Sequence, residues 1–389
     1  MPCDWAAPCA PCWRSRIDWR RGRGPASPAP STRVKLSRKM SPTRVMPGLG
    51  PGRHPPLQPG WVDAPHHHVA LGDFGLESGE SIQDCHVTYV VHGPQRAPGL
   101  PAAGVPVVLA LSAIGSHHHR LDMLIGPGRA LDTRRFAVVA VDALGNGLAS
   151  SPSNATAQPG HAFPRFTIRD MVTSQAAVLD AIGVDTLHAV VGASMGGMQA
   201  LQWAVSHPSR VARVAAMTPM ARTTPWAAAV NECSRRALAA GGSQPWDAWV
   251  PLMQLLAGRT PAQVDGAFDS AEAVIRWIGQ RTDAWAAQGF SPIDWLYQSW
   301  AYDAHDVGGT PGFGGDTAAA LASIRARTLV AAPPLDLYNP APAARWAADR
   351  IAGARFVELD TDWGHQSASA ADAASVRRLD EEIAALLSG

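Results

Sequence analysis

The residues best suited to chemistry form the segment Gly-Ala-Ser-Met-Gly-Gly at positions 192–197. A strand-like apolar run precedes this G-x-S-x-G pattern and a helix-like run follows it, which is the context of a nucleophile elbow. A sharp strand-to-helix turn exposes the serine hydroxyl in such an elbow, so the pattern predicts Ser194 as a nucleophile. A phosphate-binding glycine-rich turn is the alternative, but the segment lacks a Walker lysine and a G-x-G-x-x-G spacing.

A serine hydroxyl becomes nucleophilic when a base accepts its proton and a carboxylate orients that base. Downstream of the elbow, Asp336 follows the apolar run 328–332 and His365 follows the run 354–359. The carboxyl ends of parallel strands meet at one edge of a sheet, and the chain order serine, acid, histidine agrees with this arrangement. We therefore predict a catalytic triad of Ser194, Asp336 and His365. Other aspartates that could replace the acid are Asp303, Asp306, Asp360 and Asp362.

Two backbone N–H groups are the expected donors to an oxyanion. Met195 follows the nucleophile at a helix N-terminus, where the helix dipole also favours negative charge. The loop after the apolar run 105–111 should supply the second donor. That loop reads Ser-Ala-Ile-Gly at positions 112–115, and we predict the N–H of Ala113.

Two histidine triplets, at positions 66–68 and 117–119, raise the alternative of a metal site. Consecutive histidines point in different directions on any regular element, and no carboxylate or cysteine pattern completes a set of ligands. The sequence therefore predicts solvated loop histidines, no metal site and no bound cofactor.

Short apolar runs alternate with helical patterns from residue 85 onward. The runs are nearly continuous, which is typical of strands covered by helices on both faces. One helix is well marked, because apolar residues recur every three or four positions over 168–182, after Thr167 as N-cap and before Gly183. This alternation predicts an α/β fold with a mostly parallel sheet. The expected strands are 85–91, 105–111, 136–141, 187–191, 211–217, 328–332 and 354–359.

The interval 222–322 breaks the alternation, because it is helix-like throughout and contains seven of the 14 tryptophans. We interpret it as a helical cap inserted over the end of the sheet, which leaves 61–221 and 323–389 as the core. Most of these tryptophans should pack the cap, and a few should line an apolar entrance.

The net charge of +1 is a cancellation between two unlike parts. Residues 1–60 hold 11 of the 33 basic residues and two of the 32 acidic ones, a net +9, so the remainder carries −8. This proline- and arginine-rich segment lacks apolar periodicity and predicts a disordered tail, either native or translated from upstream of a start at Met40 or Met46. A nucleic-acid or membrane-binding arm and a redox or metal pair at Cys9 and Cys12 are disfavoured alternatives, because neither has a supporting context. No apolar run is long enough to span a membrane, so we expect a cytoplasmic protein that binds neither nucleic acid nor membrane.

From about Val69 to its C-terminus the chain resembles the homoserine O-acetyltransferase group of the α/β-hydrolase fold. The matching segments are Leu71–Phe74, Gly126–Gly128, Phe166–Val172, Gly192–Leu201, Asn231-Glu232 with Arg235, and Gly364-His365. The resemblance implies a ping-pong reaction in which Ser194 accepts an acetyl group from acetyl-CoA, a co-substrate, and passes it to an acceptor hydroxyl. It also implies that Arg235 binds the carboxylate of the acceptor, with a solvent-facing helix arginine as the alternative.

The sequence departs from this family after the histidine, where an aspartate usually meets the ammonium group of the acceptor. This chain has Gln366 there, and a neutral amide cannot make that charge-assisted bond. An acyltransferase and a carboxylic-ester hydrolase therefore both stay open, with a small ester, acyl-CoA or alcohol as partner. A non-catalytic binding protein is disfavoured by the complete triad, and the sequence leaves a homodimer and a monomer open.

Overall fold

The computed structural model describes residues 45–389, and residues 1–44, with the pair Cys9 and Cys12, lie outside the described part. The described chain contains a nine-stranded sheet of order β1-β2-β3-β7-β6-β8-β9-β10-β11. The strands β1, β2, β3 and β7 pair antiparallel, and those from β7 to β11 pair parallel. The antiparallel edge consists of β1 (Val45–Pro47), β2 (His66–Gly75) and β3 (Ser81–His92). The parallel part consists of β7 (Ala137–Val141), β6 (Val107–Leu111), β8 (Ala189–Ala193), β9 (Arg213–Met217), β10 (Arg327–Ala332) and β11 (Arg355–Glu358).

This sheet confirms the predicted α/β class, because each of the seven expected apolar runs overlaps an observed strand. The runs are continuous because both faces are covered. In β6, for example, Leu109 packs in one hydrophobic cluster and Val108 in another on the opposite face. Side chains of a strand alternate between faces, so a strand buried on both sides needs apolar residues at every position.

Helices on both faces complete the core. The helix α1 (Ile168–Ala181) begins with a capping box between Thr167 and Asp170, and it packs with α2 (Met195–Ser206) in one cluster. On the other face, α10 (Ala373–Ser388) contributes Leu379 and Ile383 to the second cluster. Shorter helices are η1 (His118–Leu124), η2 (Gly160–Ala162), η4 (Val307–Gly309), α8 (Thr317–Ala322), α9 (Ala341–Ala348) and η5 (Gly364–Ala368), and β4 (Gln95–Ala97) pairs with β5 (Leu100–Pro101) in a hairpin.

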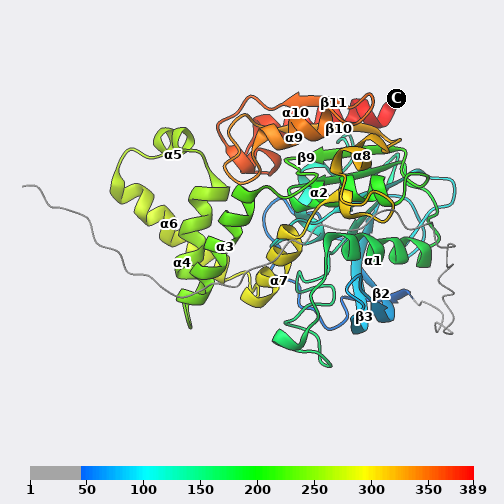
Figure 1. The fold of residues 1–389 in the computed structure, drawn as a ribbon, viewed down its shortest axis with the longest axis horizontal. Helices are drawn as coiled ribbons and strands as arrows, with labels where there is room; N and C mark the ends of the chain where they lie inside the picture. Colours follow the sequence, from blue (N-terminus) through cyan, green and yellow to red (C-terminus); the bar gives the residue numbers. More distant parts are fainter. Residues whose placement is uncertain (1–44) are drawn as a thin grey trace, which may run out of the picture. The chain divides into compact units, whose positions relative to one another are not determined.

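The interval expected to form a cap is helical from 225 to 303. Figure 1 shows α3, α4, α5 and α6 grouped beside one end of the sheet, with α7 nearer to α1. Several of these helices begin with proline at the first helical position, where its missing N–H costs no hydrogen bond. Their bounds are α3 (Pro225–Ala240), α4 (Pro245–Met253), the π-helical turn η3 (Gln254–Gly258), α5 (Pro261–Ala267), α6 (Ala271–Ala286) and α7 (Pro292–Asp303).

The predicted tail boundary at residue 60 is wrong for residues 45–60, which belong to the folded part. Val45 pairs with Val69 across β1 and β2, and Pro55 is buried. At Gly52 a Cβ atom would lie 2.7 Å from the carbonyl oxygen of Gly147, so this segment packs closely on the core. Its attachment uses backbone hydrogen bonds and close backbone contact, neither of which requires apolar periodicity.

Over residues 45–389, no helix combines the length and the apolar character needed to cross a bilayer.

Candidate active site

Ser194 lies between the end of β8 and the start of α2, with φ 58° and ψ −125°. Few residues other than glycine adopt positive φ, and such conformations cluster at functional sites where the surrounding structure holds them. Here the Ser194 N–H donates to the carbonyl oxygen of Met217 at 2.9 Å. The close turn also requires two glycines, because a Cβ on Gly192 would lie 2.1 Å from the Gly196 oxygen, and one on Gly196 would lie 2.9 Å from the Leu111 oxygen.

The structure brings Ser194, His365 and Asp336 together in one buried hydrogen-bonded chain. The Nε2 atom of His365 lies 2.8 Å from Ser194 Oγ, and its Nδ1 atom lies 2.7 Å from Asp336 Oδ2. The other Asp336 oxygen accepts hydrogen bonds from the N–H groups of Tyr338 and Asn339, both at 2.8 Å. A carboxylate fixed in this way keeps the proton on Nδ1, so Nε2 is free to accept the serine proton.

The four other aspartates considered for the acid have different surroundings. Asp303 accepts from Asn231, and Asp306 accepts from the N–H of Gly308. Asp360 and Asp362 are exposed. Asp336 is therefore the aspartate that the structure puts against His365.

The two expected oxyanion donors differ in their surroundings. Met195 is the first residue of α2, and the N–H groups of a first helical turn have no intrahelical acceptor. The Ala113 N–H instead donates to Ser116 Oγ at 2.8 Å, and that hydroxyl donates back to the Ala113 carbonyl at 3.0 Å. Ala113 lines the same cavity as Ser194, so its N–H would have to exchange the Ser116 oxygen for an oxyanion.

The cavity beside Ser194 has a volume of about 350 Å³ and lies between the sheet and the helices of the cap. Three tryptophans of the cap line it, as expected for an apolar entrance. Among residues 45–389, those that line it include no carboxylate and one arginine, Arg120. The main lining side chains are Trp249, Met253, Trp285, Trp295, Arg120, Gln254, Gln288 and Gln366.

Comparisons with known proteins agree with this geometry. Residues 106–366 match the model of the alpha/beta hydrolase fold family. Homoserine O-acetyltransferase of Clavibacter michiganensis is 30% identical over 80% of this chain and 91% of its own length. The enzyme of the same name from Symbiobacterium thermophilum is 31% identical over 75% of this chain and 87% of its own. The chain belongs to the homoserine O-acetyltransferase family of the α/β-hydrolase fold.

Solved structures of this fold include two kinds of enzyme. The acetyl esterase MekB superimposes with a TM-score of 0.76 and 26% identity, over 84% of this chain and 97% of its own. Homoserine O-acetyltransferase from Bacillus anthracis gives a TM-score of 0.71 over 83% of this chain and 97% of its own, and at 21% identity it shows the fold alone. Both acyl transfer to an acceptor and ester hydrolysis thus occur on this architecture. This family member is accordingly an acyl-transfer enzyme with an α/β-hydrolase core.

The structure gives Arg235 partners other than a substrate. Its guanidinium contacts Asp303 at 2.8 Å and Glu232 at 3.0 Å, and it donates to Ser299 Oγ at 3.1 Å. It is absent from the residues that line the cavity. The expectation that Arg235 binds the acceptor carboxylate therefore finds no support in this arrangement, because two acidic side chains already neutralise the guanidinium.

Arg120, which the sequence analysis did not single out, is the arginine that does line the cavity. It donates to the Ala368 carbonyl at 2.7 Å. Desolvation lowers the pKa of Arg120 to about 10, so the side chain keeps its charge at neutral pH. No motif around Arg120 in the sequence indicates that it lines the cavity.

Tyr338 is a second residue that sequence reasoning missed. Its ring lies 5.1 Å from the His365 ring in an edge-on arrangement, and its hydroxyl donates to Asn231 Oδ1 at 2.5 Å. Asn231 in turn donates to Asp303 at 2.7 Å, which extends this network to Arg235. Burial raises the pKa of the Tyr338 hydroxyl, which keeps it a neutral donor. The network connects the cap helix α3 to the turn that carries the catalytic acid.

The prediction of solvated loop histidines is wrong for most of the two triplets. His66, His67 and His68 lie in β2, and His67 is buried. The triplet 117–119 is buried throughout. Burial lowers the pKa of His117 to about 3, and burial together with His118 lowers the pKa of His66 to about 4, so both rings are neutral at pH 7. The triplet 117–119 lies in the interior because the start of β2 and residues 48–65, which join β1 to β2, pack against it.

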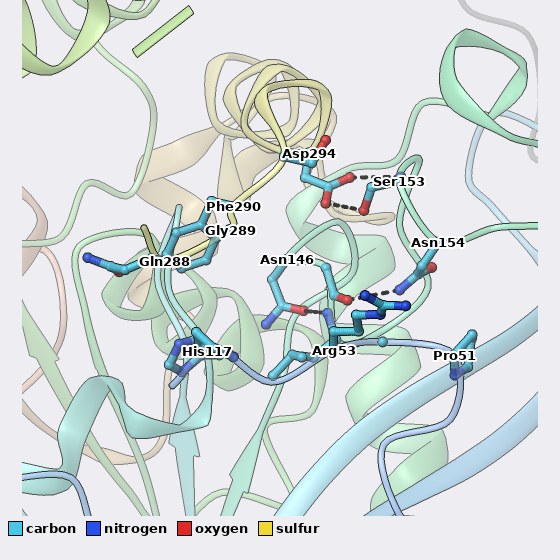
Figure 2. Close-up of a pocket in the computed structure, with 15 residues that line it drawn as sticks. Pro51, Arg53, His117, Asn146, Ser153, Asn154, Gln288, Gly289, Phe290 and Asp294 are labelled. Atoms are coloured by element: carbon cyan, nitrogen blue, oxygen red, sulfur yellow. Dashed lines mark hydrogen bonds between the residues drawn. The ribbon is translucent and has the colours of Figure 1, made fainter. Parts of the chain in front are cut away.

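A second cavity, of about 260 Å³, lies beside this histidine-rich region (Figure 2). Its lining includes Arg53, His117 and Asp294, and it contains no member of the triad. Asp294 accepts hydrogen bonds from the N–H and the hydroxyl of Ser153, at 3.0 and 2.5 Å. Burial raises the pKa of Asp294 to about 6.

Proposed function

We propose that the enzyme carries a small acyl group as an ester on Ser194 and transfers it to the hydroxyl group of an acceptor. The observation that supports this most directly is the continuous chain from Ser194 Oγ through His365 to Asp336, at 2.8 and 2.7 Å. Ser194 and His365 line a cavity that is large enough for a small acyl group and part of its carrier.

In the first half-reaction Ser194 Oγ attacks the carbonyl carbon of the donor while its proton moves to His365 Nε2. The N–H groups of Met195 and Ala113 stabilise the oxyanion, and the imidazolium returns the proton to the leaving group as the acyl-enzyme forms. In the second half-reaction His365 takes the proton of the acceptor hydroxyl, whose oxygen attacks the acyl ester and releases Ser194. The acceptor thus leaves as an ester and the enzyme is regenerated.

We take acetyl-CoA as donor and homoserine as acceptor for the principal hypothesis, because relatives over most of the chain carry the name homoserine O-acetyltransferase. A relative from Pseudomonas putida named homoserine O-succinyltransferase, 28% identical over 75% of this chain, supports testing succinyl-CoA as well. The tryptophans on the cavity wall are apolar, so they favour the uncharged acetyl group over a succinyl group, which carries a carboxylate.

Ester hydrolysis is the second candidate, and one observation favours it. Within the described part of the chain the cavity lining contains no carboxylate, and it presents Gln366 directly after the catalytic histidine. An acceptor ammonium group would therefore have no anionic partner there, and charge-assisted hydrogen bonds are about twice as strong as neutral ones. Water, which needs no such partner, could then remove the acyl group.

The release of free CoA from acetyl-CoA, measured with and without L-homoserine, separates the two candidates. Release that depends on homoserine supports transfer, whereas equal release in its absence, together with hydrolysis of p-nitrophenyl acetate, supports the esterase. The variant Gln366→Asp should raise kcat/KM for homoserine if the missing carboxylate limits acceptor binding. Gln288→Asp, at another position of the same lining, is the matched control. Failure of a fluorophosphonate to label Ser194 in folded protein would contradict both candidates.

A further inference from the structure

Four histidines gather around His54. His54 belongs to residues 48–65, which we name the N-terminal strap; His66 begins β2, and the other three form the triplet 117–119. The ring centres of the other four histidines lie within 5.4 Å of the His54 ring. The Nε2 atoms of four of these rings meet in two pairs, His66 with His118 and His54 with His119, each at 3.1 Å.

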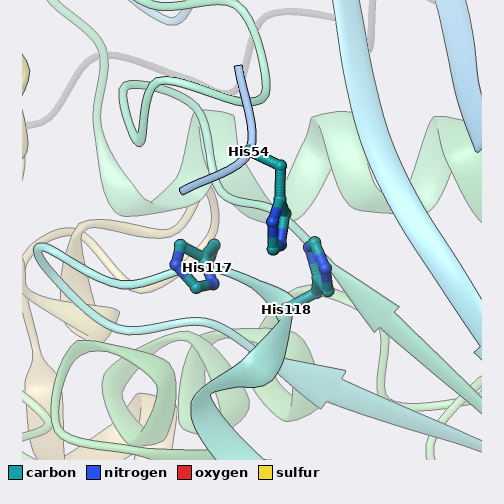
Figure 3. A group of neighbouring side chains, drawn as sticks. All are labelled: His54, His117 and His118. Atoms are coloured by element: carbon teal, nitrogen blue, oxygen red, sulfur yellow. The ribbon is translucent and has the colours of Figure 1, made fainter. Parts of the chain in front are cut away.

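Three of these side chains have the spacing of a metal site. One ring nitrogen each of His54, His117 and His118 lies within 4.8 Å of the other two. Figure 3 shows the His54 ring between the rings of His117 and His118. Zinc–nitrogen bonds of about 2.0–2.1 Å put two ligand nitrogens roughly 3.3–3.4 Å apart in a tetrahedron, so small ring movements would close the site.

Two buried carboxylates prepare the histidines as ligands. The Nδ1 atom of His118 lies 3.0 Å from Asp142 Oδ2, and that of His119 lies 2.6 Å from Asp122 Oδ2. In each pair the Nδ1–H of the histidine donates to the carboxylate, which leaves Nε2 without a proton and able to bind a cation. Metal-binding histidines commonly have this carboxylate partner, which fixes the tautomer and raises the basicity of the ligand atom.

His117 adds an unsatisfied atom to the same place. Its side chain is buried, and its Nδ1 atom has no hydrogen-bond partner within residues 45–389. The residue also lines two cavities, one of which is shown in Figure 2. A bound cation would give this region a partner that the described side chains do not.

The charge of the region agrees with a cation. Asp142 and Asp122 are both buried, and in the described part of the chain their ion pairs are with His118 and His119 alone, not with lysine or arginine. Buried charges in proteins are normally paired or coordinate metals. A dication would balance the two carboxylates.

We propose that His54, His117 and His118 bind one divalent transition-metal ion of the zinc type, with the fourth coordination position next to His66 and His119. Imidazole nitrogens suit zinc and its first-row neighbours rather than magnesium or calcium. The ion would fasten the N-terminal strap to the loop that carries Ala113, because His117 directly follows Ser116. The site is therefore structural and lies outside the triad.

The first test uses the full chain without an affinity tag, stripped of metal by a chelator. Zn²⁺ titrated against a chromophoric competitor should bind with a stoichiometry of one per chain. Co²⁺, used as a spectroscopic probe, should show the intense visible absorption of a tetrahedral site and lose it when Zn²⁺ is added. A wild-type chain that binds no Zn²⁺ in competition, or that shows only octahedral Co²⁺, would overturn the proposal.

Variants then locate the site. His54→Asn should weaken Zn²⁺ binding by more than 100-fold, and Asp142→Asn by about 10–100-fold. His161→Asn, an exposed histidine in η2, is the matched control and should leave the affinity unchanged. His54 lies on the half-buried strap, so its variant should keep the far-ultraviolet circular dichroism of the wild type. Folded His54→Asn protein with wild-type affinity would overturn the assignment.

Discussion

Two of the buried histidine–carboxylate pairs in the described part of the chain differ in what the second ring nitrogen of the histidine contacts. His365 pairs with Asp336 at 2.7 Å, and His118 pairs with Asp142 at 3.0 Å, in both cases through Nδ1. At the first pair Nε2 faces the hydroxyl of Ser194 at 2.8 Å, whereas at the second it faces Nε2 of His66 at 3.1 Å. A histidine–carboxylate pair can thus serve as a base or as a metal ligand, and the group beside Nε2 of the histidine decides between the two.

Both pairs arise from the same edge of the sheet. Asp142 directly follows β7, and the triplet that contains His118 follows β6. Asp336 and His365 follow β10 and β11. Parallel strands end on one edge and deliver polar side chains there. What distinguishes the two places is the strained elbow at Ser194, which lies next to the pair from β10 and β11.

The largest expected effect follows from removing the group that distinguishes the first pair. Ser194→Ala should reduce kcat by about 10⁶, since a triad without its nucleophile retains only binding and oxyanion stabilisation. The burst of p-nitrophenol from p-nitrophenyl acetate should disappear, while Ser209→Ala, an exposed serine, should keep it. An unchanged burst amplitude in Ser194→Ala would refute the assignment of the nucleophile.

Replacing each carboxylate by its amide compares the two pairs directly. Asp336→Asn should lower kcat by about 10⁴, because an amide can donate to Nδ1 and favour the wrong tautomer. Asp142→Asn should have a much smaller effect on kcat and act instead on the affinity for Zn²⁺. Steady-state hydrolysis of p-nitrophenyl acetate and Zn²⁺ competition on both variants provide the comparison. Equal losses of kcat would show that the two pairs are not functionally distinct.

Asp294 is a buried carboxylate that has a serine rather than a histidine as its partner, and it should make stability depend on pH. The pKa of Asp294 is about 6 in the folded protein, against an ordinary value of 3.8. Between pH 4 and pH 6 the folded state therefore binds more protons than the unfolded state. Stability from this group is complete below pH 4 and is lost as pH rises through 6, by about 3 kcal/mol.

Urea unfolding at pH 4 and pH 7 tests this dependence. Asp294→Asn should be more stable than the wild type at pH 7, and the two should converge toward pH 4. The exposed Asp269→Asn serves as control, with the wild-type profile expected. A wild-type difference between pH 4 and pH 7 that Asp294→Asn retains in full would contradict the prediction.

The smallest effect is expected from Tyr338→Phe, which alters the support of the catalytic pair and leaves the pair itself intact. The ring would still pack against His365, but Asn231 Oδ1 would lose its donor. A net loss of about 1 kcal/mol in the free energy of unfolding follows. Chemical denaturation measures it, and a variant as stable as the wild type would show that the hydroxyl contributes nothing.

The triad residues were predictable because their signals are local. The strained turn at Ser194 requires glycines at fixed positions, and these appear in the sequence as G-x-S-x-G. Asp336 and His365 follow apolar runs that must be strands, because continuous apolar runs of this length suit a sheet covered on both faces. Short-range periodicity and turn geometry therefore determined the fold class and the order of the triad.

Other contacts join residues far apart in the chain. The hydrogen bond from Tyr338 to Asn231 spans 107 positions, and the contact between His66 and His118 spans 52. No local pattern encodes such proximity, and for this reason the burial of the histidine triplets was not predicted. The role of Arg235 was implied by the family resemblance and stays a prediction. Residues 45–60 were assigned to the tail for a related reason, since their attachment depends on a neighbouring strand.

The sequence by itself thus determined which residues could do acyl-transfer chemistry and on what kind of sheet. It could do so because the nucleophile elbow, the strands and the helices each have a recognisable pattern within a few residues. Only the tertiary structure decided what surrounds those residues. Burial, ion pairing and the identity of the third group beside a histidine depend on which distant segments pack together, and packing is a property of the whole fold.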